Sequence, residues 1–345
     1  MNSILPLSQY PSPQPTPPWQ QAVAGAIRTP EALLAALALT PAQLPAIFNG
    51  SDQFPLRVPH SFVARMKRGD PDDPLLRQVL PLSEENALTQ GYLDDPVGDL
   101  DASETPGVLH KYHGRALLIT TAACAVHCRY CFRRNFPYQQ QNAAANQWDE
   151  AIRYIEQDTS ITEVILSGGD PLALSDQRLA ALSNRLDQIP HLTRLRIHTR
   201  LPVVIPERIC DSLITWLSSS RLSPVVVVHI NHPNEIDKDL HQALQRLQTV
   251  PNITLLNQSV LLHGVNDDSN TLIALSEALF ASGVHPYYLH LLDKAQGTAH
   301  FDIPLARAIT IFDEIHAKLP GYLVPRLVQE QAGASGKTLL PLNSI

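Results

Sequence analysis

Three cysteines within eight residues are the part of the sequence best suited to chemistry. Cys124, Cys128 and Cys131 stand in a C-x3-C-x2-C spacing. Three thiolates on one loop can ligate three irons of a [4Fe-4S] cluster and leave the fourth iron open to a small molecule, whereas fully ligated electron-transfer clusters use four. A structural zinc site is the alternative, but it needs four ligands and would have to recruit His127 from inside the same loop. We expect Cys210, far along the chain, to be an inert core thiol and not a fourth ligand.

Alternating strand-like and helix-like segments must position this loop. Short β-branched or aromatic runs predict strands at 116–120, 163–166, 195–198, 225–230, 253–262, 287–292 and 322–328. Helical patterns lie between them, around 147–157, 175–188, 206–218, 235–248, 270–282 and 304–318. This alternation predicts a parallel sheet with helices outside, either a barrel or a doubly wound sheet. In a barrel, chemistry is expected on the loops that follow the strands, and the cysteines follow the first of them.

The first 107 residues have a different texture. Prolines crowd the start of the chain, which predicts an extended arm before Trp19. Thr29 is a good N-cap and Pro30 a good first helical residue, so a helix is expected over 31–39. Further short helices and a charged stretch to residue 107 indicate an ordered wrap over a core. We therefore divide the chain into an arm and helical wrap (1–107), a β/α barrel (108–328) and a C-terminal tail (329–345).

Composition limits the class of protein. The 345 residues are 44% hydrophobic and carry a net charge of −7, which excludes a disordered chain and argues against a general nucleic-acid or anionic-membrane surface. We find no window apolar enough to cross a bilayer and no secretory signal. Four cysteines are a poor disulfide framework. We expect a cytoplasmic enzyme with no membrane partner and no direct nucleic-acid partner.

Six further motifs follow one another along the chain: FPLR at 54–57, CRYCFRR at 128–134, SGGD at 167–170, HINHPNE at 229–235, NQSVLL at 257–262 and GVND at 264–267. In order and spacing, this set resembles the lysine 2,3-aminomutase family of radical S-adenosylmethionine enzymes. The resemblance covers residues 54–337. It implies a partial (β/α)6-type radical SAM barrel with an N-terminal, mainly helical or irregular segment. It also implies three cofactors: a [4Fe-4S] cluster, S-adenosylmethionine and pyridoxal 5′-phosphate.

The resemblance assigns cofactor roles to residues on the strand ends and in the tail. The cysteines would hold the cluster, and the positions expected near S-adenosylmethionine are Ser167, Gly168, Gly169, Asp170, His229 and Gln258. There the glycines would allow close backbone approach, and Asp170 would accept a hydrogen bond from the methionine ammonium. Lys337 matches the lysine that forms a Schiff base with pyridoxal phosphate, and Lys111 and Arg115 match the cations that hold its phosphate. A strand-end turn, buried polar residues and solvated surface lysines are the structural alternatives.

The same resemblance implies a dibasic amino acid as substrate. Arg133 matches the residue that grips the substrate carboxylate. Asp293 and Glu330 match two acids that bind the distal ammonium of L-lysine, although Glu stands at 330 where the lysine enzymes place Asp. Two carboxylates in a closed pocket favour a cationic side chain, because an unpaired buried charge is costly. Solvated surface acids are the alternative for both.

The implied reaction converts L-lysine to β-lysine with an external electron donor of the flavodoxin or ferredoxin type. Eight residues follow Lys337. This short tail and the stretch 287–301 resemble the proteobacterial branch that makes (R)-β-lysine. A lysyl-tRNA-synthetase-like ligase attaches that product to elongation factor P. A catabolic or osmolyte-forming lysine 2,3-aminomutase is the alternative, and a non-catalytic iron-sulfur or zinc-binding regulator is a third possibility.

Overall fold

The computed structural model of the chain describes residues 16–44, 50–51, 54–141 and 148–340. Most of the expected Pro-rich arm lies outside these residues. The first helix is α1 (Pro18–Ala24). It starts one residue before Trp19, where the arm was expected to end. Among the described residues, the helices are all too short or too polar to cross a membrane.

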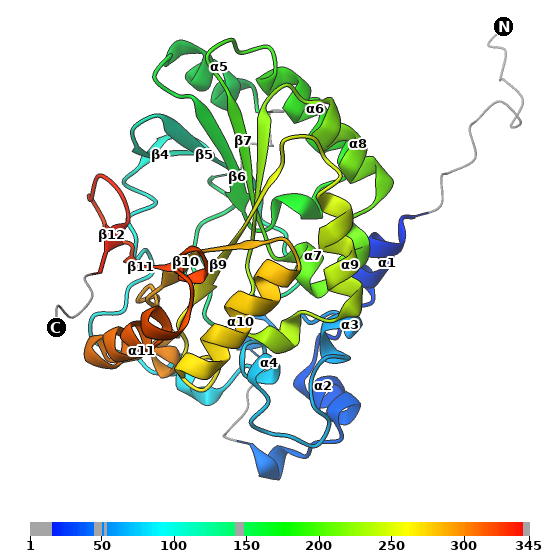
Figure 1. Cartoon of the computed structure of the whole chain (residues 1–345), viewed down its shortest axis with the longest axis vertical. Coiled ribbons are helices and arrows are strands. Elements are labelled where there is room, and N and C mark those ends of the chain that lie inside the picture. The colour runs from blue at the N-terminus through cyan, green and yellow to red at the C-terminus, as the bar shows by residue number, and fades with distance from the viewer. Residues whose placement is uncertain (1–15, 45–49, 52–53, 142–147, 341–345) are drawn as a thin grey trace, which may run out of the picture.

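A ten-stranded sheet forms the centre of the molecule (Figure 1). Seven neighbouring strands are parallel: β5 (Arg115–Thr121), β6 (Glu163–Gly168), β7 (Arg194–Thr199), β8 (Ser223–Val228), β9 (Thr254–Val260), β10 (His285–His290) and β11 (Arg326–Gln329). The antiparallel strands β4 (Val108–Tyr112) and β3 (Ser103–Thr105) extend one side, and β12 (Thr338–Leu339) extends the other. In the described chain, β3 and β12 are the sheet's two edges, so the barrel is open. This confirms the predicted partial barrel.

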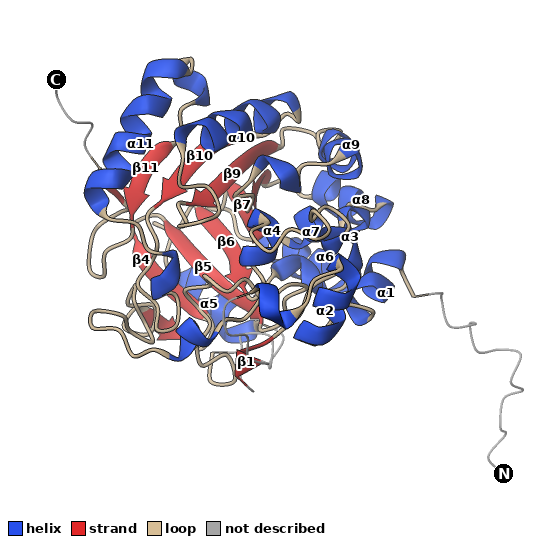
Figure 2. Ribbon diagram, turned by 90° about the horizontal axis from the view of Figure 1, so that it is seen from below, coloured by secondary structure: helices blue, strands red, loops and turns tan. Residues whose placement is uncertain are grey.

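Helices cover the outer face of this sheet (Figure 2). One lies between each pair of consecutive parallel strands: α5 (Asp149–Gln157), α6 (Asp176–Leu186), α8 (Asp211–Ser219), α9 (Lys238–Leu247), α10 (Ser269–Ala281) and α11 (Leu305–Lys318). The short α7 (Leu201–Val204) directly follows β7. Six β/α units followed by a seventh strand match the alternation predicted from the sequence.

The sequence predicted none of the antiparallel strands β3, β4 and β12, and one of the seven predicted strands differs clearly from the structure. The predicted strand 322–328 is a single 3-10 turn, Gly321–Leu323, followed by β11 from Arg326. Pro320 and Pro325 flank the turn and supply no backbone donor to a sheet ladder. In β8, Val226 and Val228 belong to the hydrophobic core, whereas Val225 lines an interior cavity.

The N-terminal segment packs onto the barrel and shares its core. Helix α2 (Pro30–Leu37) begins as predicted, with the Thr29 hydroxyl accepting a hydrogen bond from the Ala32 amide at 3.3 Å. The short helices α3 (His60–Val63) and α4 (Pro74–Arg77) follow. Leu33 and Phe62 of this segment are fully buried in the same hydrophobic cluster as Val164 of β6. The wrap therefore closes over the barrel end instead of folding separately.

Candidate active site

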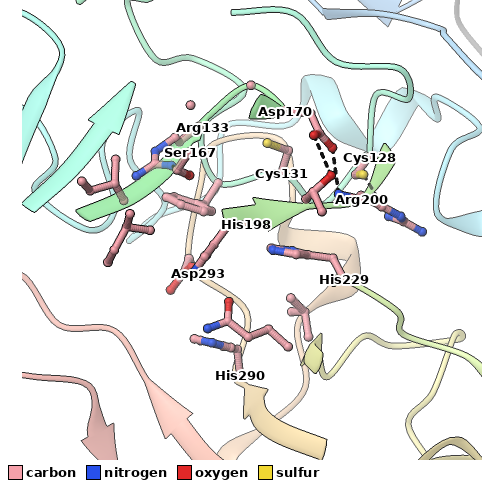
Figure 3. Close-up of a pocket in the computed structure, with 18 of the residues that line it drawn as sticks. Cys128, Cys131, Arg133, Ser167, Asp170, His198, Arg200, His229, His290 and Asp293 are labelled. Carbon is pink, nitrogen blue, oxygen red and sulfur yellow. Dashed lines mark hydrogen bonds between the residues drawn. The ribbon is translucent and has the colours of Figure 1, made fainter. Parts of the chain in front are cut away.

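One cavity of about 550 Å³ lies against the inner face of the sheet. Its lining includes every residue to which the sequence assigned a cofactor or substrate role: Lys111, Arg115, Cys124, Cys128, Cys131, Arg133, Ser167, Gly168, Gly169, Asp170, His229, Gln258, Asp293, Glu330 and Lys337. In Figure 3, Cys128 and Arg200 gather on one side of this cavity, away from Asp293 and His290. The fold thus brings the predicted site together from both ends of the chain.

The cysteine loop follows β5 and is held by the N-terminal wrap. The His127 amide donates to the Arg57 carbonyl at 3.1 Å, and the Arg129 amide donates to the Gln78 carbonyl at 2.9 Å. The fully buried Arg129 guanidinium pairs with Glu85 through two hydrogen bonds of 2.8 and 2.5 Å. These contacts fix the loop backbone and leave its thiols facing the cavity.

The three thiols share a desolvated environment. Burial raises the pKa of the Cys124 thiol well above its usual value, and the nearby Asp170 and Cys131 raise it further. Burial and the neighbouring Cys128 raise the pKa of Cys131 to about 11. Metal binding must therefore displace thiol protons, as is general for thiolate ligands. Within the described ranges, no three His, Cys, Asp or Glu side chains converge on one ion position. A four-iron cluster does not require this, because each of its cysteines ligates a different iron.

The two other sequence expectations for this region concern His127 and Cys210. The Nδ1 atom of His127 lies 2.7 Å from the Pro55 carbonyl, and its ring stacks on Phe54 at 5.0 Å. Cys210 does not line the cavity; it is half-buried before α8, with its Sγ 3.4 Å from an Asp176 carboxylate oxygen. It lies apart from the cluster loop, as predicted, although it is less buried than a core thiol.

The Ser167–Asp170 turn packs directly against the start of the cysteine loop. The Gly169 amide donates to the Thr121 carbonyl at 2.7 Å, and the Asp170 amide donates to the Ala123 carbonyl at 2.8 Å. A Cβ atom on Gly168 would lie 2.7 Å from the Thr121 oxygen, and one on Gly169 would lie 2.5 Å from the Ala123 oxygen. Gly168 also has a φ of +115°. The close approach that needs these glycines is therefore to the loop backbone, where the sequence analysis expected an approach to a cofactor.

The Asp170 carboxylate is occupied by protein donors. One oxygen accepts from the Leu172 amide at 3.0 Å and the Thr199 hydroxyl at 2.7 Å, and the other accepts from the amides of Arg200 and Leu201 at 2.8 Å each. A carboxylate has about four lone-pair sites, so this set fills them. In this geometry Asp170 joins the ends of β6 and β7, and it has no site left for the methionine ammonium expected from the sequence.

Unpartnered polar atoms mark where a ligand fits. The Nε2 atoms of His198, His229, His290 and Gln258 are buried and have no hydrogen-bond partner among the described residues, and all four residues line the cavity. Burial lowers the pKa of His229 to about 4 and the pKa of the other two histidines well below the usual value. The imidazoles are therefore neutral at pH 7. Buried polar atoms normally have partners, so this wall fits a polar organic molecule such as a nucleoside or a cofactor ring.

Lys337 reaches the cavity because the tail folds back as a hairpin. Strand β12 pairs antiparallel with β11, with Thr338 opposite Gln329, and this brings Lys337 next to Glu330. The Lys337 ammonium donates to one Glu330 oxygen at 2.5 Å, and the Tyr112 hydroxyl donates to the other at 2.7 Å. Burial raises the pKa of Glu330, but Lys337 and Tyr112 outweigh burial and lower it overall. Both side chains thus line the cavity and are largely buried.

Asp293 faces the same space from the loop after β10. Among the described residues it has no side-chain hydrogen bond or ion pair within 4 Å. Burial raises its pKa to about 7, with Lys337 opposing and Glu330 adding to the shift. An unpaired carboxylate of this kind is a good partner for a cationic ligand.

A third acid, Asp99, was missed by the sequence analysis. Its two oxygens lie 2.6 Å from the Lys111 ammonium and 2.7 Å from Nε of Arg133. Arg133 also donates to the Ser167 hydroxyl at 3.0 Å. Arg115 has its guanidinium 4.7 Å from the centre of the Tyr112 ring. Asp99 lies in a stretch with several acids, and its sequence context does not distinguish it from them.

The open β/α barrel and the three-cysteine loop define the class as a radical S-adenosylmethionine enzyme. The radical SAM superfamily profile matches residues 118–269. A solved structure of Streptococcus suis SuiB bound to S-adenosylmethionine is a distant likeness. It has 14% sequence identity and a TM-score of 0.46, and the match covers 67% of this chain and 53% of that one.

Full-length relatives narrow the class to one family. The chain is 48% identical to the L-lysine 2,3-aminomutase of Haemophilus influenzae, over 93% of this chain and 95% of that protein. It is 47% identical to the enzyme of that name from Escherichia coli, over 94% of each. It is 36% identical to the one from Acetoanaerobium sticklandii, over 93% of this chain and 77% of that protein. The chain belongs to the lysine 2,3-aminomutase family, and this membership implies a [4Fe-4S] cluster, S-adenosylmethionine and pyridoxal phosphate.

Proposed function

We propose that the protein is an L-lysine 2,3-aminomutase that moves the α-amino group of L-lysine from C2 to C3. The observation that carries this proposal is the shared cavity, in which Lys337, Glu330 and Asp293 lie within one enclosed space with the cysteine loop. The Lys337–Glu330 ion pair accounts for the contact between those two residues, but it does not account for a cavity that they share with Asp293 and the cysteine loop. A reaction that needs a cluster, a cofactor lysine and a cationic substrate does account for it.

We call the part of the cavity beside the cysteine loop the cysteine end, and we propose that it holds the cluster and S-adenosylmethionine. Cys124, Cys128 and Cys131 would each ligate one iron and would leave the fourth iron open to S-adenosylmethionine. The unpartnered Nε2 atoms of His229 and Gln258 supply polar contacts to it. Ser167, Gly168 and Gly169 form the wall beside it, and Asp170 acts indirectly by joining β6 to β7.

We call the part of the cavity around Lys337, Glu330 and Asp293 the tail end, and we propose that it holds pyridoxal phosphate. Lys337 provides the covalent attachment, and Lys111 and Arg115 hold the phosphate. When bound, the cluster and S-adenosylmethionine would supply hydrogen-atom abstraction from C3 of lysine, and pyridoxal phosphate would carry the nitrogen that migrates from C2 to C3. The chain's own residues position these groups and surround them with a desolvated cavity.

Substrate selection depends on the charged side chains of the cavity that are not assigned to a cofactor. Arg133 holds the α-carboxylate with the guanidinium nitrogen that is not used by Asp99 or Ser167. Asp293 and Glu330 hold the distal ammonium, because the Glu330 oxygen that now pairs with Lys337 becomes available once Lys337 is attached to the cofactor. A neutral or acidic amino acid would leave two carboxylates uncompensated, which is costly in a desolvated site.

The product is proposed to be (R)-β-lysine for modification of elongation factor P by a lysyl-tRNA-synthetase-like ligase, with a flavodoxin or ferredoxin type protein as electron donor. Support comes from the motifs over 287–301 and from the higher identity to the Haemophilus influenzae and Escherichia coli relatives, 48% and 47%, than to the Acetoanaerobium sticklandii relative, 36%.

The test is an anaerobic assay of the reconstituted protein with L-lysine, dithionite, S-adenosylmethionine and pyridoxal phosphate, followed by chiral analysis of the product. Wild type and the exposed-lysine control Lys318→Ala are expected to form (R)-β-lysine, and Lys337→Ala is expected to form none. An S product would reject the elongation factor P role and favour a catabolic one. Cleavage of S-adenosylmethionine without any β-lysine would reject the substrate assignment.

A further inference from the structure

Arg200 is a buried cation that the sequence analysis did not connect with the cluster. It is the first residue after β7, 7% exposed, and it lines the cavity beside the cysteine loop (Figure 3). Its Nη1 atom donates to the Sγ atom of Cys128 at 2.9 Å and also contacts the Tyr130 hydroxyl. In the described chain, Cys128 is the cluster cysteine that receives a hydrogen bond from a charged side chain.

Buried partners hold both terminal nitrogens of the guanidinium in this position. Its Nη2 atom donates to Gln78 at 2.7 Å and to Glu235 at 3.1 Å, and both of these residues are fully buried. The rings of Phe62 and Tyr130 lie on it with their centres 5.5 Å away. One edge of the planar fork therefore faces the sulfur while the other edge is held by acceptors on the far side.

The backbone of Arg200 is held as firmly as its side chain. Its amide donates to Asp170 at 2.8 Å, and Asp170 in turn donates through its own amide to the Ala123 carbonyl, next to Cys124. A rotation of the guanidinium away from Cys128 would break the bonds to Gln78 and Glu235 in a buried place. A buried polar group that loses its partner is costly, so the donor stays on the sulfur.

We propose that Arg200 is a positioning residue that donates to the Cys128 thiolate of the loaded cluster and raises the reduction potential of that cluster. The inference rests on the proposed function, because it requires the cluster at Cys124, Cys128 and Cys131. Reduction adds one negative charge to the cluster, and a buried donor with a positive charge stabilises the reduced form more than the oxidised form. Hydrogen bonds to the sulfurs and local net charge are known determinants of cluster potentials.

The functional consequence concerns electron delivery. The reduced cluster must pass one electron to S-adenosylmethionine, and an external donor must first reduce the cluster. A hydrogen bond that raises the cluster potential makes reduction of the cluster by the external donor easier. It makes electron transfer from the cluster to S-adenosylmethionine less favourable. Arg200 thus sets the balance between the two steps without touching the substrate.

The test uses Arg200→Gln, Arg200→Lys and the control Arg196→Gln. Arg196 is a matched control because it lines the same cavity and pairs with Glu163 at 2.5 Å but has no contact with a cluster cysteine. Each protein is reconstituted anaerobically, its iron and sulfide are counted, and its midpoint potential is measured by redox titration with EPR detection, without lysine. We expect Arg200→Gln to lower the equilibrium constant for reduction about tenfold, which is about 59 mV for one electron. Arg200→Lys, which keeps the charge, should recover most of the shift, and Arg196→Gln should match wild type.

The outcomes separate this inference from the proposed function. Absence of a four-iron cluster in wild type would reject the proposed function. A full cluster in Arg200→Gln with the wild-type potential would reject the role of Arg200. If Arg200→Gln does not take up the cluster, wild type labelled with 15N only in arginine guanidinium groups gives the answer by pulsed EPR of the reduced cluster. A 15N coupling that is lost in Arg200→Lys supports the bond, and absence of the coupling in wild type overturns it.

Discussion

The two ends of the cavity are built on different principles. At the cysteine end, side chains are fixed by buried backbone and side-chain partners: Asp170 accepts four hydrogen bonds from the chain, and Arg200 is held by Gln78 and Glu235. At the tail end, charged groups pair mainly with one another, as Lys337 does with Glu330. Asp293 has no ion pair there within the described chain.

This difference indicates which groups stay and which are exchanged. A permanent cluster needs rigid ligands, and removal of any supporting contact costs desolvation energy. A substrate that enters and leaves needs charges that can change partners at little cost. The ion pairs at the tail end are therefore replaced by contacts to a ligand when it binds. The hydrogen bonds and ion pairs at the cysteine end remain in place as part of the fold.

The largest expected effect comes from removing a proposed cluster ligand. Cys128→Ala should abolish β-lysine formation and reduce the iron content after reconstitution, because a cluster held by two cysteines is unstable. Cys210→Ala is the matched control, since Cys210 does not line the cavity. Iron and sulfide analysis with EPR measures both. Full iron content in Cys128→Ala would show that the loop does not hold the cluster.

The second largest effect, after loss of a cluster ligand, is expected from neutralising an acid at the tail end. Asp293→Asn should lower kcat/KM for lysine roughly a hundredfold, because breaking a desolvated ion pair costs about 3 kcal/mol. The cluster content should stay at the wild-type level. Asp302→Asn is the control, as Asp302 lies outside the cavity lining and accepts from the Tyr92 hydroxyl at 2.7 Å. Equal kcat/KM values for Asp293→Asn and wild type would remove Asp293 from the substrate site.

The pKa of Asp293 predicts a pH dependence at this end only. With a pKa of about 7, Asp293 is ionised at pH 8 and mostly protonated at pH 6. Protonation removes the charge that binds the lysine ammonium, so the Kd for lysine should rise roughly tenfold from pH 8 to pH 6. Isothermal titration of the reconstituted protein measures this, and Asp293→Asn should lose the dependence. A Kd that falls toward pH 6 would contradict the assignment.

The smallest expected effect is at the edge of the tail end. Tyr112→Phe removes the hydroxyl that donates to Glu330 at 2.7 Å. One hydrogen bond of this kind is worth about 1 kcal/mol, so the KM for lysine should rise roughly fivefold with little change in cluster potential. Steady-state kinetics and the redox titration check the two parts. A shifted potential with unchanged KM would reverse the proposed division between the ends.

Much of this arrangement could be predicted from the sequence because its signals are local. Short apolar runs located the strands within a few residues, and the cysteine spacing located the cluster loop next to the first of them. The placement of Lys337 needed the family resemblance, since a lysine after a glycine-bearing stretch has no local signal for burial. The β11–β12 hairpin that places it in the cavity consists of a very short pair of strands.

The misses share one physical cause, which is contact between residues far apart in the chain. Asp99 and Arg200 look ordinary in sequence, and their roles arise only when the wrap and β7 meet the cysteine loop. The ligand expected for Asp170 is replaced by donors at residues 199–201, thirty positions away. The glycines at 168 and 169 were expected to face a cofactor, but their space is taken by the backbone of residues 121–123.

The most direct test of the central claim follows one hydrogen atom across the cavity. The reconstituted protein is incubated anaerobically with L-lysine deuterated at C3, and the adenosyl group of S-adenosylmethionine is then analysed by mass spectrometry. If the cysteine end and the tail end act on the same substrate carbon, deuterium should appear in the adenosyl group as β-lysine forms. Formation of β-lysine with an unlabelled adenosyl group would contradict the account.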